Sequence, residues 1–223
     1  MRLEILGRAL AVSTIRTRGA LSKRLWPVNA PLLAILLFST MAAAGQAFFP
    51  AGAFYPDNLK LDSFKAKWYS EQLTALQEPS LFETKQNSTV QSYRFLWLRS
   101  FHHPVAIRVL IYADGSGVVV TKMADGTGGN KPGKLILNKT EPLSPDAVKI
   151  FTQRIHQLNY WTLPMRDTHP SGVDGAQWVI EGIDHGTYHL VDRWSPNDGP
   201  VRKLGLFFLH NLSGSHLRAE EVY

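Results

Sequence analysis

Apolar residues recur at helical spacing in three stretches of the chain. The first stretch begins at Asp62 or Ser63, either of which can cap a helix, and it ends at Glu78-Pro79-Ser80. The second begins at Ser144-Pro145-Asp146, and the third begins near residues 198–200. The side chains expected to face the core are Leu61, Phe64, Trp68, Leu73 and Leu76 in the first stretch, Val148, Phe151, Ile155 and Leu158 in the second, and Val201, Leu204, Phe207, Phe208 and Leu212 in the third.

Alternating or β-branched runs between these helices predict strands. Four consecutive runs, at 91–100, 105–113, 117–123 and 134–140, predict an antiparallel meander. Two later runs, at 177–183 and 187–194, predict a hairpin that turns at Asp184-His185-Gly186. One face of this hairpin is expected to carry Trp178, Ile180, Tyr188, Leu190 and Trp194, which would place Glu181 and Asp192 on opposite faces.

The expected fold class is therefore α+β. We predict an antiparallel sheet of about six strands with two or three helices packed on one face, preceded by an N-terminal signal or anchor segment. Composition divides the chain into a leader at 1–47, a linker at 48–60, a single α+β domain at 61–215 and a polar tail at 216–223. A domain of this length buries a sizeable core without disulfides or metals.

The leader has the parts of a secretory signal peptide. Residues 1–44 hold six basic residues and one acidic residue, the run 31–44 is apolar, and small residues surround Ala44 and Ala47, after either of which cleavage fits. No charge occurs between Leu25 and Pro56, so an uncleaved leader is also long enough to remain as a membrane anchor, which needs roughly 20 residues. Both alternatives place the rest of the chain outside the cytoplasm.

The chain contains no cysteine, which excludes a disulfide scaffold, a zinc site with cysteine ligands and a thiol nucleophile. An exported domain without cysteine favours the bacterial envelope over the eukaryotic secretory pathway. We therefore expect a periplasmic or extracellular protein, or one anchored in the inner membrane.

The net charge of +6 does not indicate nucleic-acid binding. The residues after position 44 hold 18 basic and 17 acidic side chains, so the body of the protein is nearly neutral. A neutral body releases few counterions from a phosphate backbone. We expect no nucleic acid as a partner, and contact with a membrane only through the N-terminal segment if it stays uncleaved.

Few motifs point to catalysis or to a cofactor. Residues 128–134 match G-x-x-x-x-G-K, but Leu135 stands where a P-loop needs Ser or Thr, and a strand follows instead of a helix. Neither H-E-x-x-H nor G-x-S-x-G occurs. We expect no cofactor and no metal. The enzymatic alternative is a hydrolase or metal-dependent enzyme that uses His102, His103, Asp174 or His189.

Ring-bearing residues beside hydrogen-bonding groups indicate a candidate binding site. Residues 101–104 close the first strand pair, and residues 192–196 close the later hairpin. If both lie at one end of the sheet, His102, His103 and Arg193 could hydrogen-bond a ligand while Trp194 supplies apolar area. Asp192 is expected to be buried against Arg99 or Arg108 and to order this site. The full set of candidate binding residues is His102, His103, Asp174, Trp178, Asp192, Arg193 and Trp194.

Four strings carry a family resemblance: EPSL at 78–81, YRFLWLRSFHHPVAIRV at 93–109, DGAQWVIEG at 174–182 and YHLVDRWSP at 188–196. With these strings the chain resembles an uncharacterised family of exported bacterial proteins. The resemblance covers roughly residues 62–210, implies export and a bacterial origin, and transfers no activity or site.

Three functions stay open at this point. The first is a non-enzymatic envelope domain that binds a protein, peptide or carbohydrate through a sheet face or through the loops at 101–104, 163–175 and 184–186. The mixture of Arg and aromatic residues in the strands suits such ligands. The second is the enzyme described above, and the third is a structural envelope protein.

Overall fold

The computed structural model describes residues 47–87, 89–166, 172–214 and 222–223. The predicted signal or anchor segment at 1–46 and most of the predicted tail lie outside the described residues. Within the part of the chain that is described, no helix is both long enough and apolar enough to span a membrane.

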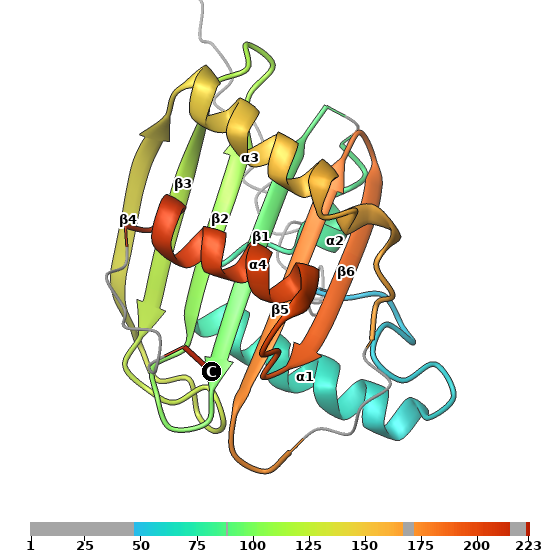
Figure 1. Cartoon of the computed structure of the whole chain (residues 1–223). Helices are drawn as coiled ribbons and strands as arrows, with labels where there is room; N and C mark the ends of the chain where they lie inside the picture. The colour runs from blue at the N-terminus through green and yellow to red at the C-terminus, as the bar shows by residue number, and fades with distance from the viewer. Residues whose placement is uncertain (1–46, 88, 167–171, 215–221) are drawn as a thin grey trace, which may run out of the picture. The chain divides into compact units, whose positions relative to one another are not determined.

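Six strands form one antiparallel sheet in the order β4-β3-β2-β1-β5-β6 (Figure 1). The α+β class and the six strands are confirmed. The meander forms four neighbouring strands of the six, and the later hairpin pairs with the first strand, so that β1 becomes central. The strands are β1 (Gln91–Arg99), β2 (Val105–Ile111), β3 (Gly117–Ala124), β4 (Leu135–Leu143), β5 (Ala176–Asp184) and β6 (Thr187–Trp194).

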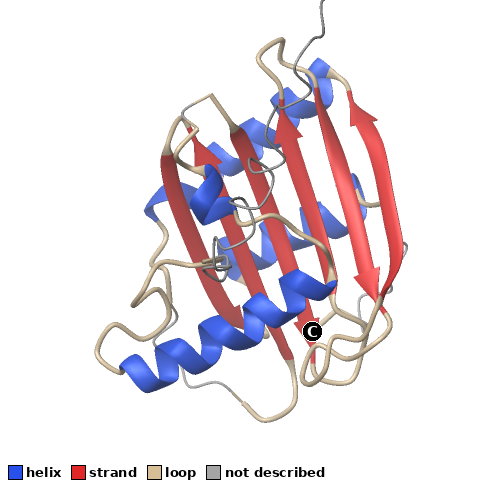
Figure 2. Ribbon diagram, turned by 180° about the vertical axis from the view of Figure 1, so that it is seen from behind, coloured by secondary structure: helices blue, strands red, loops and turns tan. Residues whose placement is uncertain are grey.

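Helices cover both faces of this sheet, whereas the sequence analysis placed them on one. Helices α3 (Pro145–Gln157) and α4 (Gly199–Phe207) lie on one face (Figure 1), and α1 (Leu59–Ala75) and the short α2 (Leu81–Thr84) lie on the other (Figure 2). The prediction was wrong because the central strands β1 and β5 are buried on both sides along almost their whole length. A strand buried on both sides needs cover on both.

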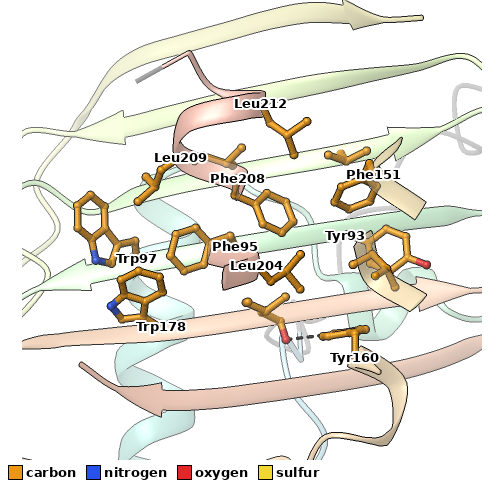
Figure 3. Packing of buried hydrophobic residues seen from close by; sticks show 14 of the residues in the cluster. Tyr93, Phe95, Trp97, Phe151, Tyr160, Trp178, Leu204, Phe208, Leu209 and Leu212 are labelled. Atoms are coloured by element: carbon orange, nitrogen blue, oxygen red, sulfur yellow. Dashed lines mark hydrogen bonds between the residues drawn. The ribbon is translucent and has the colours of Figure 1, made fainter. Parts of the chain in front are cut away.

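The face under α3 and α4 is an apolar, mostly aromatic core. Trp97 and Trp178 meet edge to face at 6.2 Å between ring centroids, and Phe95 packs between Trp178 and Phe208 (Figure 3). A Cβ on Gly205 would lie 2.2 Å from the Trp178 ring, so α4 needs glycine there to approach the sheet. The stripes predicted for these helices are confirmed, with Val148, Phe151, Ile155, Val201, Leu204, Phe208 and Leu212 buried.

Helix α1 on the opposite face buries only part of the predicted stripe. The helix begins at Leu59 with Asn58 as its N-cap. The Asp62 carboxylate, expected as a cap, instead accepts hydrogen bonds from the backbone N–H groups of Gly52, Phe54 and Tyr55 at 2.8–3.1 Å. The buried side chains are Asp62, Tyr69, Gln72, Leu73 and Leu76, whereas Leu61 is 47% exposed and Phe64 is 68% exposed.

Both predicted domain boundaries need correction. Residues 48–60 were expected to be a linker, but Phe48, Phe49 and Phe54 are buried in the core beneath α1. In the predicted tail, Val222 is buried, and the main-chain oxygen of Tyr223 accepts hydrogen bonds from the indole N–H groups of Trp97 and Trp178. The folded unit therefore extends beyond residues 61–215 at both ends.

The predicted phase of the β5–β6 hairpin was wrong in one strand. Trp178 pairs with Arg193, and Glu181 pairs with Leu190, so residues of opposite parity share a face. Trp178 and Ile180 lie in the α3 and α4 core, whereas Leu190 lies in the α1 core. The tight turn at 185–186 sets this register. Glu181 and Asp192 consequently project to the same face.

Candidate functional site

A groove opens at one end of the sheet, on the face that α1 covers. It lies between α1 and residues 100–101, 127–130 and 172–174, and Gln177 and Trp194 also line it. We call it the α1 groove; its volume is about 510 Å³. The end of β1, the start of β5 and the end of β6 meet here, because Leu98 pairs with Gln177 and Gln177 pairs with Trp194. Residues 101–104 and 192–196 thus lie at the same end of the sheet, which is the condition that the candidate binding site required.

The outer side of α1 forms one wall of the groove. Leu61, Phe64 and Trp68, spaced by three and four residues, all line it. The Trp68 indole N–H donates a hydrogen bond to the Gly128 carbonyl oxygen at 3.0 Å, which fixes the ring against the opposite loop. Three members of the predicted stripe, Leu61, Phe64 and Trp68, therefore line the groove, whereas Leu73 and Leu76 are buried in the core as predicted.

The glycine-rich loop between β3 and β4 forms a second wall. A Cβ on Gly128 would lie 2.6 Å from the Leu98 Cα, and one on Gly129 would lie 2.8 Å from the Ser100 carbonyl oxygen. The loop packs flat against the end of β1 only because it has no side chains at these positions. This close packing accounts for the glycines that resemble a P-loop.

Trp194, a predicted binding residue, forms a third wall and is half-buried. Its ring packs under the loop before β5, where a Cβ on Gly175 would lie 2.6 Å from the Trp194 ring and one on Gly172 would lie 2.8 Å from its indole nitrogen. The same loop presents Val173, which is 93% exposed, and Asp174 to the groove. On the neighbouring turn, Phe101 is 68% exposed.

One buried polar atom in the groove lacks a partner. Gln177 is 4% exposed, and its Oε1 accepts no hydrogen bond from any described residue. An unsatisfied buried acceptor costs stability, on the order of 1–3 kcal/mol. Gln177 lines the groove, so a rotation of its amide would let a ligand's N–H or O–H donor reach Oε1 and remove this cost.

The one lysine in the groove lining is already paired. Lys65 Nζ lies 2.6 Å from Asp192 Oδ2, and the Tyr69 hydroxyl donates a hydrogen bond to Asp192 Oδ1 at 3.2 Å. Burial raises the pKa of Asp192, and the Lys65 ammonium offsets part of that rise. Asp192 is buried as predicted, but its partner is Lys65 and not Arg99 or Arg108. Arg99 stacks on Trp97, and Arg108 pairs with Glu78.

The remaining candidate binding residues do not line the α1 groove. His102 packs against the Tyr223 ring, and His103 Nδ1 lies 2.9 Å from the Gly126 carbonyl oxygen. Arg193 donates hydrogen bonds to the carbonyl oxygens of Pro164 and Met165, and so joins the loop before β5 to the edge of the sheet. Trp178 is fully buried in the opposite core. Of the seven residues, the groove brings together Asp174 and Trp194, with Asp192 behind Lys65.

A buried ionic network lies farther along the same face. Arg94 donates two hydrogen bonds to Glu181 and one to the Pro79 carbonyl oxygen, and Glu78 accepts charge-assisted contacts from Arg108 and Lys122. Burial alone would raise the pKa of Glu78, but Arg94, Arg108 and Lys122 together lower it. The network attaches the turn at 77–80 to the sheet. Four of its members, Glu78, Arg94, Arg108 and Glu181, stand in the strings that carry the family resemblance.

The residues of the enzymatic alternative do not form one cluster. His189 packs against Tyr160 and Trp161 beside Gly182, several residues along β5 from Asp174, and burial lowers the pKa of His189. Across the described ranges, no group of three or more His, Cys, Asp or Glu is arranged to hold a metal ion.

Sequence reasoning missed Leu61, Phe64, Phe101 and Gln177 as groove residues. A signal for the first two was present: α1 carries a second stripe at 62, 65, 69, 72 and 76 that also has helical spacing. The predicted stripe combined residues from both sides of the helix, since Leu73 and Leu76 are buried whereas Leu61 and Phe64 are exposed. A search with this sequence against protein-family models and curated proteins gives no match.

Proposed function

We propose that this protein is an exported bacterial envelope protein whose domain binds a ligand in the α1 groove without catalysis. The observation that carries the binding proposal is the set of large apolar side chains left exposed around one cavity. Leu61, Phe64, Phe101 and Val173 come from three separate segments and all line it. Exposed apolar side chains that gather in one place are typical of interaction sites.

The groove is also preformed. Trp68 is fixed by its hydrogen bond to Gly128, and Trp194 is fixed by the packing of Gly172 and Gly175. A site whose aromatic walls are already ordered loses little conformational entropy when a ligand binds. Such a site sits on the rigid end of the sheet, where the loops of β1, β3 and β5 gather.

Export is supported by the leader alone. A basic segment, an apolar run at 31–44 and the mostly small residues at 42–47 precede Phe48 and Phe49, the first buried residues in the described part of the chain. A fusion of residues 1–60 to a reporter that is active only outside the cytoplasm should be active. An inactive reporter, with the fusion protein present in the cytoplasm, would contradict export.

Site-specific photo-cross-linking in bacterial cells tests the binding site. A photoreactive amino acid at Phe101 or Val173 should give a discrete cross-linked product, because both side chains border the groove. The matched control is Ile150 on α3, which is 56% exposed and lies on the other face of the sheet (Figure 1). Equal products from all three positions, or none from Phe101 and Val173, would contradict the proposal.

A further inference from the structure

We infer that the ligand of the α1 groove is a polypeptide segment that carries an apolar side chain next to Lys or Arg. This inference rests on the proposed binding function and names the class of ligand. It follows from three properties of the groove: its apolar border, the one buried acceptor of its described lining that has no hydrogen-bond partner, and its charge.

The border favours a peptide over a sugar. Leu61, Phe64, Phe101 and Val173 carry no hydrogen-bonding side-chain group. Sugar hydroxyls placed against them would lose water without gaining a partner, which is costly. The apolar side chains of a peptide would instead bury their surface together with that of the border.

The buried acceptor matches a peptide backbone. Gln177 lines the groove, and a rotation of its amide would turn the unpaired Oε1 toward a peptide N–H, which every residue except proline supplies at the same place. Ser100, which also lines the groove, is less available, since its hydroxyl donates to the Gly175 carbonyl oxygen and accepts from the Gly175 N–H.

The charge of the groove is complementary to a cation. Lys65 is neutralised by Asp192, whereas the exposed Asp174 carboxylate forms no ion pair with any described residue. The faces of Trp68 and Trp194 add negative electrostatic potential, which attracts Lys and especially Arg. Lys131 lines an adjoining cavity beyond Trp68, so the cationic group is expected at the Asp174 end.

The test is a selection from random linear peptides displayed on phage, with the full chain as bait and its Phe64→Ser variant for counter-selection. Recovered sequences should be enriched in Lys or Arg beside apolar residues. One of them, synthesised with blocked ends, then serves as the probe for affinity measurements. Circular dichroism of each variant establishes that it is folded.

Asp174→Asn should weaken binding of this probe about three- to fivefold, as an exposed charge pair contributes. Gln177→Leu should weaken it at least about fivefold, because a peptide donor would lose its acceptor. Asp114→Asn is the matched control; this carboxylate lies in the turn between β2 and β3, at the other end of the sheet, and its loss should change nothing.

Two results would overturn the inference and leave the binding function standing. One is that Phe64→Ser abolishes binding but the recovered peptides are acidic or neutral, or Asp174→Asn leaves the affinity for the probe unchanged. The other is failure of all peptides while a neutral oligosaccharide binds the full chain and not its Trp194→Ala variant. If neither peptides nor oligosaccharides bind, the proposed function itself is wrong.

Discussion

Helices α3 and α1 cover opposite faces of one sheet and use their side chains in opposite ways. Helix α3 buries Val148, Phe151 and Ile155 and exposes mostly polar residues. Helix α1 buries the polar Asp62 and Gln72, among other residues, and leaves Leu61 and Phe64 exposed. The side chains of α3 thus serve the fold, whereas the outer side of α1 is available for a partner.

The two faces of the sheet repeat this difference. The face under α3 and α4 is packed with aromatic rings, whereas the α1 face contains buried charges such as Arg94, Glu181 and Asp192. Buried charges are retained only with partners, and each of these three has one. Polar packing on this face fixes where α1 and the turn at 77–80 lie, and thereby fixes the groove.

The largest loss of unfolding free energy among these variants is expected from Arg94→Ala. This change would leave Glu181 buried without its cation and would remove a contact to Glu78. Loss of one partner of a buried pair costs about 3–5 kcal/mol, which denaturant unfolding would measure. Arg154→Ala on α3, where the arginine is exposed, is the control and should cost under about 0.5 kcal/mol. Equal losses would show that the network on the α1 face is not structural.

A smaller loss is expected from Asp62→Asn. The carboxylate accepts three backbone hydrogen bonds that attach residues 52–55 to α1, so the change should cost about 1–3 kcal/mol at neutral pH. Burial alone would raise the pKa of Asp62, but the N–H donors of Phe54, Tyr55 and Gly52 lower it overall.

The lowered pKa of Asp62 fixes the sign of its pH dependence. Its stabilising contribution is present above the unfolded pKa of about 3.8 and is lost as pH falls through the lower folded pKa. The difference in unfolding free energy between the wild type and Asp62→Asn should therefore shrink on acidification. A difference that stays constant as pH falls well below 3.8 would contradict the assigned hydrogen bonds.

The smallest change in unfolding free energy is expected from Gln177→Leu, and this change is a gain instead of a loss. Removing a buried acceptor that has no described partner should leave stability unchanged or raise it by about 1 kcal/mol. Thermal unfolding of the variant beside wild type measures this. A loss above about 1 kcal/mol would show that the side chain serves the fold rather than a ligand.

The sequence predicted most of the fold because its apolar periodicity and turn residues agree. Ser144-Pro145 marks the start of α3, and the strands fall within a few residues of the predicted runs. The face assignment failed where local pattern is ambiguous: β1 and β5 are buried on both sides, and the register of β6 depends on a turn one residue shorter than the one expected.

The groove was predictable only in part. Trp194 and Asp174 were found from their place at strand ends, but the partner of Asp192 was not, because Lys65 reaches it from a distant helix. Phe64 was misassigned because the helical spacing of apolar residues is the same for a side chain that packs in the core and for one that lies exposed at a binding site. The loop glycines showed a turn, but not that the turn packs against β1.

The account is tested most directly by one unfolding measurement on Phe64→Ala and Phe151→Ala, which remove the same side chain from α1 and α3. Phe151 is fully buried, so its loss should cost about 3–5 kcal/mol. Phe64 is 68% exposed, and its loss should change the unfolding free energy by no more than about 0.5 kcal/mol. Similar losses for the two variants would contradict the account, because Phe64 would then belong to the core and not to a binding site.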